Sequence, residues 1–265
     1  MQTPSTRPFA VVTGASSGIG LELAKQFAEN GYDVLVTADD EAIHDTPAQL
    51  AGTVSAEVLR ADLRSPQAVE QLWQVATAGG RAVDAVALHA GVGAGGKFVD
   101  TDLDTELAMI SLNVESVVQL AKHAARHMVE RGEGKLLFTS SLAARVPAPN
   151  QAVYGATKAF VQSFAQALRQ EVGEAGVSVT AFLPGPTDTD FFDRADMQDT
   201  AMGQTSLKDD PAKVAAQAFA ALQAGRDHVV TGSLATKVQG ALANLLPNAL
   251  TAKGQGKLSE PGSGH

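Results

Sequence analysis

Short apolar runs alternate along the chain with longer segments in which apolar residues recur every three or four positions. Runs rich in β-branched and aliphatic residues are typical of strands buried on both faces, and the longer period is typical of helices with one buried face. The runs predict strands at residues 9–12, 32–37, 54–59, 82–88, 136–139, 177–183 and 228–231. The periodic segments predict helices at residues 21–29, 66–78, 104–131, 152–170 and 211–223.

This alternation predicts an α/β fold, in which one parallel sheet carries helices on both faces. Ligands of such sheets bind beyond the carboxyl ends of the strands. We therefore expect one crevice to form from the residues that lie just past the predicted strand ends, which are Gly14, Asp39, Asp62, Gly91, Ser141 and Thr187.

A chain of 265 residues fits one large domain. We expect residues 9–232 to form it, preceded by an N-terminal extension at residues 1–8. Residues 233–265 are expected to add a C-terminal helix, from the apolar segment 234–246, and a tail. The tail, residues 254–265, is rich in Gly, Ser, Lys and Pro, and is predicted to be mobile or wrapped on a neighbouring subunit.

The charge balance narrows the class of partner. A net charge of -9 and a pI near 5.1 argue against a nucleic acid or an anionic membrane surface. No apolar run approaches the roughly 20 residues of a membrane span. The chain has no cysteine, so thiolate chemistry is excluded and a reducing cytoplasm is the simplest compartment. His123 and His127 have helical spacing without an evident third ligand, so we predict no metal site.

Thr13 to Gly20 read T-G-A-S-S-G-I-G between a predicted strand and a predicted helix. Strand, glycine turn and helix form the context that a phosphate-binding turn requires. Gly14 permits the tight turn, Gly18 lets the backbone approach a pyrophosphate, and Gly20 lets the helix pack on the strand. The helix N-terminus then presents unpaired N–H groups to the anion. A dinucleotide site is predicted, and a merely flexible loop is the alternative.

Asp39 and Asp40 follow the second predicted strand. A carboxylate there can accept hydrogen bonds from the adenosine ribose and would repel a 2′-phosphate. No Lys or Arg lies in the glycine turn or just after this strand. We therefore predict NAD rather than NADP, with simple capping of the following turn as the alternative role of the two aspartates. Asp62, at the end of the third strand, is expected to contact either the adenine amino group or its own turn.

A third motif lies in the stretch from Ser140 to Lys158. Tyr154 and Lys158 are spaced i, i+4, so they share one face of the predicted helix. A free phenol has a pKa of about 10, and a nearby cation lowers that pKa towards the range of a general acid or base. Ser141 follows a predicted strand, so its hydroxyl is expected to face the same pocket. The alternative is an amphipathic helix with a surface Tyr and Lys.

Together these motifs resemble the short-chain dehydrogenase/reductase family in its ordinary short form. The resemblance covers residues 9–231 and implies a Rossmann-type doubly wound parallel sheet. The matching segments are T-G-A-S-S-G-I-G at 13–20, Asp62, L-N-V at 112–114, Ser140-Ser141, Y-G-A-T-K at 154–158, and Pro184-Gly185 with Thr187.

The resemblance also implies residue roles. The implied catalytic set is Asn113, Ser141, Tyr154 and Lys158. The implied cofactor contacts are Gly14, Ser16, Ser17, Gly18, Ile19, Gly20, Asp39, Asp62, Leu63, Ala90, Gly91, Tyr154, Lys158, Pro184, Gly185 and Thr187. The implied substrate contacts are Ser141 and Tyr154, with Phe191 and Phe192 from a lid at residues 188–210.

The chain departs from the family pattern at two places. His89 stands where the family often has Asn, and is expected either to loosen the sheet beside the cofactor or to replace a lost hydrogen bond. Ala38 stands where NAD-users commonly carry Asp, and Asp39 stands where NADP-users often carry Arg. The missing Arg favours NAD, although the acid is shifted by one position.

The activity implied is hydride transfer between a nicotinamide cofactor and a secondary alcohol or ketone. Tyr154 would exchange the proton, Lys158 would lower the phenol pKa and bind the nicotinamide ribose, Ser141 would hold the substrate oxygen, and Asn113 would support a water relay. The apolar lid suggests a small-molecule substrate with apolar bulk, or a lid anchored on the core. The family implies a homodimer or homotetramer built through helices 104–131 and 152–170. The alternative function is a non-catalytic dinucleotide sensor or scaffold.

Overall fold

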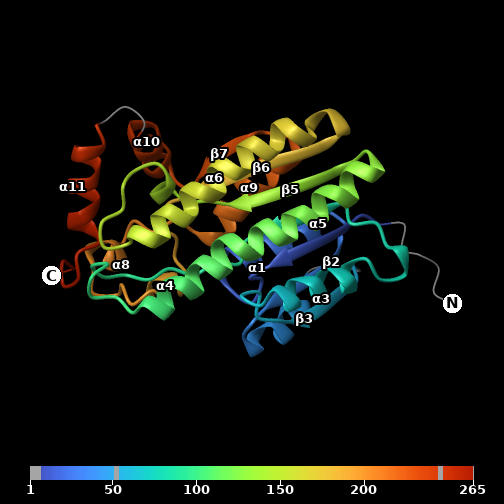
Figure 1. Ribbon diagram of the computed structural model, residues 1–265, viewed down its shortest axis with the longest axis horizontal. Coiled ribbons are helices and arrows are strands. Elements are labelled where there is room, and N and C mark those ends of the chain that lie inside the picture. The colour runs from blue at the N-terminus through green and yellow to red at the C-terminus, as the bar shows by residue number, and fades with distance from the viewer. Residues whose placement is uncertain (1–6, 51–53, 244–246, 265) are drawn as a thin grey trace.

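The computed structural model describes residues 7–50, 54–243 and 247–264. Within these ranges seven strands form one parallel sheet in the order β3-β2-β1-β4-β5-β6-β7 (Figure 1). The predicted α/β, doubly wound fold is therefore confirmed. The strands are β1 (Phe9–Thr13), β2 (Asp33–Ala38), β3 (Ala56–Arg60), β4 (Ala85–Leu88), β5 (Gly134–Thr139), β6 (Val177–Pro184) and β7 (His228–Thr231).

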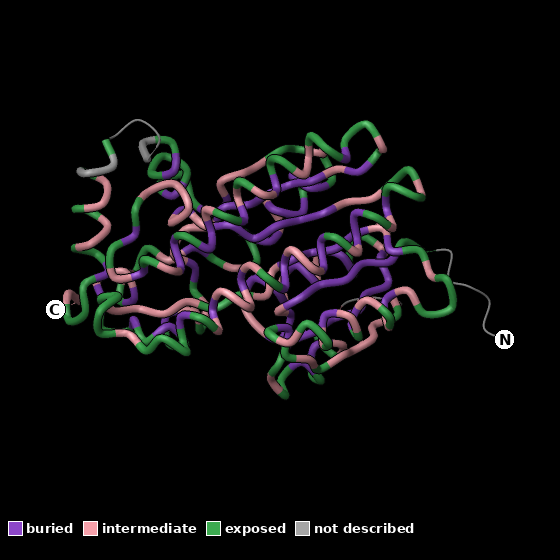
Figure 2. Tube along the Cα trace, in the orientation of Figure 1, coloured by how far each residue is buried: buried purple, intermediate pink, exposed green. Residues whose placement is uncertain are grey.

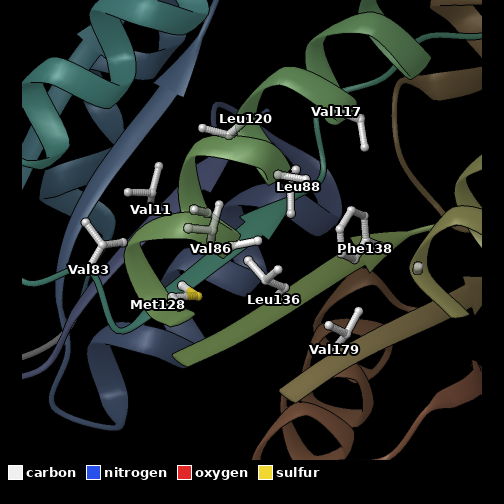
Figure 3. Close-up of a cluster of buried hydrophobic side chains, with 14 of the residues drawn as sticks. Val11, Val83, Val86, Leu88, Val117, Leu120, Met128, Leu136, Phe138 and Val179 are labelled. Atoms are coloured by element: carbon white, nitrogen blue, oxygen red, sulfur yellow. The ribbon is translucent and has the colours of Figure 1, made fainter. Parts of the chain in front are cut away.

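Helices cover both faces of the sheet (Figure 1). One face packs against α3 (Pro66–Ala76), α5 (Ser116–Arg131) and α6 (Ala152–Val172), and the other against α1 (Gly18–Glu29) and α9 (Pro211–Gln223). Successive side chains of a strand point to opposite faces, so Val11 joins the first cluster while Ala10 and Val12 join the second. Figure 2 shows the strands as a buried centre, and Figure 3 shows part of the first cluster around Leu136 and Phe138.

The strand order reverses between β1 and β4, because β2 follows β1 on one side while β4 joins it on the other. Open sheets of this class bind ligands at such a point, where neighbouring loops leave in opposite directions. The loops after β1 and β4 carry Gly14 and His89 to Gly91. The reversal therefore places these loops on either side of one crevice.

The predicted helix 104–131 is interrupted. The structure has α4 (Leu103–Ile110), a π-helical turn (η3, Ser111–Glu115) and α5. Asn113 lies in the wide turn, and 1% of its surface is exposed. Its side chain accepts a hydrogen bond from Val92 N at 3.0 Å and donates to Val92 O at 2.9 Å. Single π turns often occur at functional sites, and this one holds Asn113 against the loop after β4.

The C-terminal segment differs from the predicted mobile tail. Residues 248–258 form α11 (Asn248–Leu258), and the chain then lies on its own loops. Ser259 Oγ donates to Pro149 O at 2.8 Å, and Asp199 accepts from the backbone N–H groups of Gly262 and Gly264 at 2.8 and 2.9 Å. These polar contacts satisfy the small residues of the tail within the same chain. The helix predicted at 234–246 forms as α10 (Leu234–Ala243), and residues 244–246 lie outside the described residues, as do residues 1–6 of the N-terminal extension and His265.

Short elements complete the chain. They are η1 (Glu41–Asp45), α2 (Thr46–Gln49), η2 (Ala78–Gly80), η4 (Leu142–Ala144), η5 (Gly173–Ala175), α7 (Phe191–Arg194) and α8 (Ala201–Gln204). Figure 1 shows α8, α10 and α11 gathered at one end of the molecule, on the left of the view. In the described part of the chain, no helix is both long enough and apolar enough to cross a bilayer.

Candidate active site

A cavity of about 950 Å³ opens at the carboxyl end of the sheet. This volume is near the upper end of the usual range for ligand pockets, about 300–1,000 Å³. Residues of the glycine turn, the loops after β2, β3, β4, β5 and β6, the lid, α10 and α11 line it. All but two of the residues predicted for the site line the cavity. The exceptions are Gly20, which packs beneath the glycine turn, and Asn113, which is buried behind Gly91.

The glycine turn leaves no room for side chains at its key positions. Gly14 has a φ of +68°, and a Cβ there would lie 2.9 Å from Ala90 Cα. Gly18 has a φ of +54°, and its Cβ would lie 2.8 Å from Thr189 Cγ2. A Cβ on Gly20 would overlap the carbonyl oxygen of Gly14. Positive φ favours glycine, and close approach requires it, so these positions need glycine for the turn to pack against its neighbours in the chain.

The first turn of α1 faces this cavity. Its N-cap residue, Ser17, makes no capping hydrogen bond with its side chain, and no acidic residue lies in the first turn. Arg194 of the lid instead donates from Nη2 to Ser17 Oγ at 3.3 Å. An uncapped helix N-terminus beside a guanidinium is a site for an anionic group. Sequence reasoning missed Arg194 because it lies 177 residues from Ser17 and belongs to no motif.

The end of the cavity around Asp39 and Asp40, where the adenosine is predicted to bind, carries more charged groups than the sequence motifs indicate. Asp39 is exposed, whereas Asp40 accepts a hydrogen bond from Ser16 Oγ at 2.7 Å and keeps its other oxygen, Oδ1, buried without a partner. The glycine turn and the residues just after β2 hold no Lys or Arg, but two arginines reach Asp39 from another strand. Arg60 Nε donates to Asp39 O at 3.0 Å, and Arg64 Nη2 lies 3.7 Å from Asp39 Oδ2. Both arginines come from β3 or just beyond it, which pairs with β2.

These two arginines already have acidic partners. Arg64 Nε lies 2.8 and 3.0 Å from the two carboxylate oxygens of Asp62, and Arg60 pairs with Glu41. The Arg64 hydrogen bond holds the pKa of Asp62 below its usual value. Three carboxylates, those of Asp39, Glu41 and Asp62, therefore pair with two guanidinium groups here, and a fourth, Asp40, accepts its hydrogen bond from Ser16.

Ser141, Tyr154 and Lys158 meet at the centre of the cavity. The helix α6 carries Tyr154 and Lys158 on one face, and Lys158 Nζ lies 5.8 Å from the centre of the Tyr154 ring. Lys158 Nζ also donates to Thr139 O at 3.2 Å, and Ser140 Oγ donates to Lys158 O at 3.0 Å. These bonds join α6 to the end of β5, which is the element that delivers Ser141.

The electrostatics of this group differ from the prediction in one respect. Burial raises the pKa of Tyr154 to about 12, and the group that opposes this rise is Ser141, through a side-chain hydrogen bond. The i, i+4 spacing predicts that Lys158 lowers the pKa of the Tyr154 phenol. In the structure, burial instead lowers the pKa of Lys158 itself to about 8, because an ammonium loses its hydration there. The sequence pattern placed the two groups together but did not include the cost of desolvation.

Asn113 supports this group from behind. Its Nδ2 donates to Thr157 Oγ1 at 3.1 Å as well as to Val92 O, and Thr157 Oγ1 donates to Tyr154 O at 2.7 Å. A Cβ on Gly91 would lie 3.1 Å from both Asn113 Oδ1 and Lys158 Nζ. Glycine at this position therefore allows Asn113 and Lys158 to approach the loop after β4.

His89 replaces a family asparagine and lies under the glycine turn. Its ring is within 3.0 Å of Thr139 Oγ1 through Nδ1, and it stacks on Phe182 at a centroid distance of 6.5 Å. Burial, together with the charge of Lys158, lowers the pKa of His89 to about 3, so the ring is neutral. The backbone N–H groups of His89 and Ala90 both donate to Thr13 Oγ1. His89 thus supplies a hydrogen bond across the sheet, which is one of the two outcomes expected from the sequence.

The apolar residues of the lid fall into two sets. Phe192 and Met197 are buried in a small cluster formed by residues of the lid itself. Phe191 lines the cavity, and its ring lies 5.3 Å from the ring of Tyr154. The lid also closes on the loop after β4, where Gly95 N donates to Ala195 O at 2.8 Å.

The histidine pair on α5 has structural contacts. His127 Nε2 accepts a hydrogen bond from Val83 N at 3.1 Å, and His123 stacks on Trp73 at a centroid distance of 5.9 Å. Among the residues that the structure describes, no cluster of three or more His, Cys, Asp or Glu side chains is arranged to hold a metal ion.

Comparison with known proteins adds independent evidence. The family model described as short chain dehydrogenase matches residues 8–200. An uncharacterized short-chain type dehydrogenase/reductase of Sinorhizobium fredii, y4eK, is 36% identical over 200 residues, which cover 75% of each chain.

Two solved structures resemble the whole fold. A short-chain dehydrogenase from Sphingobium yanoikuyae in complex with NADPH has a TM-score of 0.79 and 26% identity, and covers 96% of this chain and 95% of its own. A 3-ketoacyl-(acyl-carrier-protein) reductase from Brucella melitensis complexed with NADH has a TM-score of 0.74 and 25% identity, with 84% and 96% coverage. With the parallel sheet, the glycine turn and the Ser141, Tyr154 and Lys158 cavity, these matches show that the chain belongs to the short-chain dehydrogenase/reductase family of nicotinamide-dependent oxidoreductases.

Proposed function

We propose that the protein interconverts a secondary alcohol and a ketone, with Tyr154 as the general acid and base. The observation that carries this proposal is the convergence of Ser141, Tyr154 and Lys158 in one cavity with the glycine turn. A sensor or scaffold would need the glycine turn but not the proton-transfer groups. The three side chains together therefore favour catalysis over the sensor alternative.

The residues of the inner cavity fit a dinucleotide. Gly14 and Gly18 line the cavity with main chain alone, and Asp40 Oδ1 is a buried acceptor without a protein partner. The uncapped N-terminus of α1 and Arg194 would hold the diphosphate, while Asp39 or Asp40 would accept hydrogen bonds from the adenosine ribose. Lys158 would bind the nicotinamide ribose. When bound, the nicotinamide supplies or accepts the hydride.

Reduction of a ketone needs a hydride at carbon and a proton at oxygen. With a pKa of about 12, the Tyr154 phenol is protonated at neutral pH, so it can donate that proton as the alcohol forms. Ser141 would hold the substrate oxygen by a hydrogen bond, and the Lys158 ammonium would stabilise the phenolate left behind. A water held by Asn113 would return a proton through Lys158. In alcohol oxidation each transfer runs in reverse.

The test is Tyr154→Phe, which removes the exchangeable proton and keeps the ring against Phe191. We expect kcat for ketone reduction to fall by about 10²- to 10⁴-fold, measured from the absorbance of the reduced cofactor. Cofactor affinity, measured by fluorescence titration, should change little. The matched control is Tyr32→Phe, because Tyr32 is the other tyrosine of the chain and lies outside the cavity. Full activity in the Tyr154 variant would overturn the proposed role.

NAD is the proposed cofactor. Four carboxylates against two guanidinium groups leave an excess of negative charge where a 2′-phosphate would bind. Arg64 is the residue that would favour NADP, if Asp39 and Asp62 released it, whereas Arg60 is held by Glu41 and by the backbone carbonyl of Asp39. Separate titrations with NADH and NADPH measure the preference directly. Asp39→Ser should improve NADPH affinity relative to NADH, because it removes a repulsive charge.

The proposed assembly is a homodimer or homotetramer through α4, α5 and α6. Leu103 and Leu107 of α4, Val129 of α5 and Phe160 of α6 are large apolar side chains left exposed. Light scattering after size exclusion measures the mass in solution. Phe160→Glu should shift that mass towards the monomer, whereas Leu207→Glu, a change at an exposed lid residue outside these helices, should not.

A further inference from the structure

The outer part of the cavity has an apolar wall that the side chains of the described residues leave exposed. We use the term outer wall for Leu234 and Val238 of α10 with Leu250 and Leu258 of α11. Their exposed fractions are 78%, 50%, 61% and 44%, and all four line the cavity. Exposed apolar side chains are common on convex surfaces, but four that line one concavity indicate a site for an apolar group.

The described residues that line this part of the cavity carry no charge. The charged residues among the described lining residues lie elsewhere in the cavity. Asp39, Asp40 and Asp62 follow β2 and β3, Lys158 lies on α6, and Asp190 and Arg194 belong to the lid. The residues contributed by α10, α11 and the 142–151 loop are uncharged. Lys237, Lys253 and Lys257 are exposed on α10 and α11 but do not line the cavity. A carboxylate or phosphate on the substrate would therefore find no partner at the outer wall.

The outer wall is held in place by contacts within the chain. Asn150 Nδ2 donates to Gly256 O at 3.2 Å, and Ser259 Oγ donates to Pro149 O. Both partners, Asn150 and Pro149, lie in the loop that leads into α6, two and three residues before the helix begins. The same loop therefore positions Tyr154 on one side and α11 on the other, so the distance from the reacting centre to the outer wall is built into the fold.

We propose that the outer wall binds a hydrocarbon chain carried by a neutral ketone or secondary alcohol, and that α10 and α11 select substrates by the length of that chain. This rests on the proposed function, and deepens it by naming the substrate class. One continuous cavity reaches from Tyr154 to Leu258, so a chain attached to the reacting carbon can extend between the lid and the 142–151 loop to α11.

The first test is a series of straight-chain 2-ketones from butan-2-one to undecan-2-one with saturating reduced cofactor. Each methylene buried against apolar surface can raise kcat/KM by up to about fourfold. We expect kcat/KM to rise along the series. Turnover of butan-2-one with no rise for longer chains would overturn the chain-length proposal and leave the oxidoreductase proposal intact.

The second test fills or opens the outer wall. Gly254 of α11 lines the cavity, and a Cβ there would meet nothing within 4 Å. We expect Gly254→Leu to lower kcat/KM for undecan-2-one at least tenfold and to leave butan-2-one unchanged. The matched control is Gly173→Leu, because Gly173 also has helical angles and open space around it but lies outside this cavity. Leu250→Ser should likewise lower kcat/KM for undecan-2-one more than for butan-2-one. Equal changes in kcat/KM for the two ketones in both variants would contradict the proposal.

The third test does not depend on turnover. Thermal unfolding is recorded with undecan-2-one and with decanoate, an anion of similar chain length. We expect the neutral ketone to raise Tm in the wild type and in Tyr154→Phe, and to lose this effect in Gly254→Leu. A larger rise with decanoate, or no difference between the wild type and Gly254→Leu, would overturn the proposal even if no ketone were turned over.

Discussion

The glycine turn and the outer wall line the same cavity, yet they make space for a ligand in different ways. At the turn, Gly14 and Gly18 line the cavity with main chain alone, and Gly20 beneath them lets α1 pack on the Gly14 carbonyl group. At the outer wall, space exists because α10 and α11 present to the cavity apolar side chains that the described part of the chain leaves exposed. The turn requires one residue type at each position, whereas the wall requires only apolar character and volume.

This difference teaches where the chain can change. Backbone that contacts a ligand directly cannot be varied without moving the main chain. A wall of side chains can be rebuilt one residue at a time, since α11 is held to Asn150 and Pro149 by hydrogen bonds that the wall residues do not make. We therefore expect substitutions at the turn to affect the fold and cofactor together, and those at the outer wall to affect substrate choice alone.

The largest effect is expected for Gly20→Ala. The new Cβ would overlap the Gly14 carbonyl oxygen, so α1 must move away from β1. We expect cofactor affinity to fall at least a hundredfold, and the free energy of unfolding to fall by about 1–3 kcal/mol, as for other overpacked core sites. Titration and urea unfolding measure the two. Gly254→Ala is the matched change at the outer wall, and should leave both within error, so equal losses in the two variants would erase the contrast.

The pH dependence of kcat/KM tests Lys158, which lines the cavity together with the glycine turn and the outer wall. Lys158 has a pKa of about 8, so it is charged below pH 8 and neutral above, while Tyr154 stays protonated up to about pH 12. If the ammonium is needed, kcat/KM for the reduced cofactor, which reports ionisations of the free enzyme, should fall about tenfold per pH unit above pH 8. Lys158→Met should be slow, and should show no such fall. A flat wild-type profile between pH 7 and 10 would contradict this role of Lys158.

Substitution of Arg194 tests whether the lid contributes to cofactor binding. Its guanidinium group reaches Ser17, and loss of one charge-assisted hydrogen bond costs about 1.5–3 kcal/mol. Because Arg194 is half exposed, we expect the lower end, about a tenfold rise in the Kd of the reduced cofactor for Arg194→Gln. The affinity for adenosine, which has no diphosphate, should not change. Lys213→Gln removes a charge on α9 outside the cavity and serves as the control.

The smallest effect is expected for Leu207→Ser. Leu207 is the most exposed of the large apolar lid residues, at 78%, and does not line the cavity. We expect kcat/KM for both short and long ketones to stay within twofold, and stability to stay within about 0.5 kcal/mol. A selective loss with undecan-2-one would extend the outer wall into this part of the lid.

The fold could be predicted from the sequence because patterns within short segments of the chain indicate its strands, helices and turns. Each of the seven apolar runs overlaps an observed strand, and their alternation with helices requires crossover connections and a parallel sheet. The positions of Gly14, Tyr154 and Lys158 were predictable for the same reason, since a turn between strand and helix and an i, i+4 pair are patterns within a few residues.

Tertiary structure decided what depends on distant partners and on exclusion of water. Arg194 reaches Ser17 across 177 residues, and Arg64 reaches Asp39 from beyond the neighbouring strand, so no local pattern could place them. The pKa of Tyr154 rises rather than falls because burial removes water that the sequence cannot count. The π turn at Asn113 and the docking of α11 likewise depend on Val92, Pro149 and Asn150, which are separated from them along the chain. The sequence thus determined which chemical groups are present and on which elements, while packing decided their charge, their partners and the shape of the space they enclose.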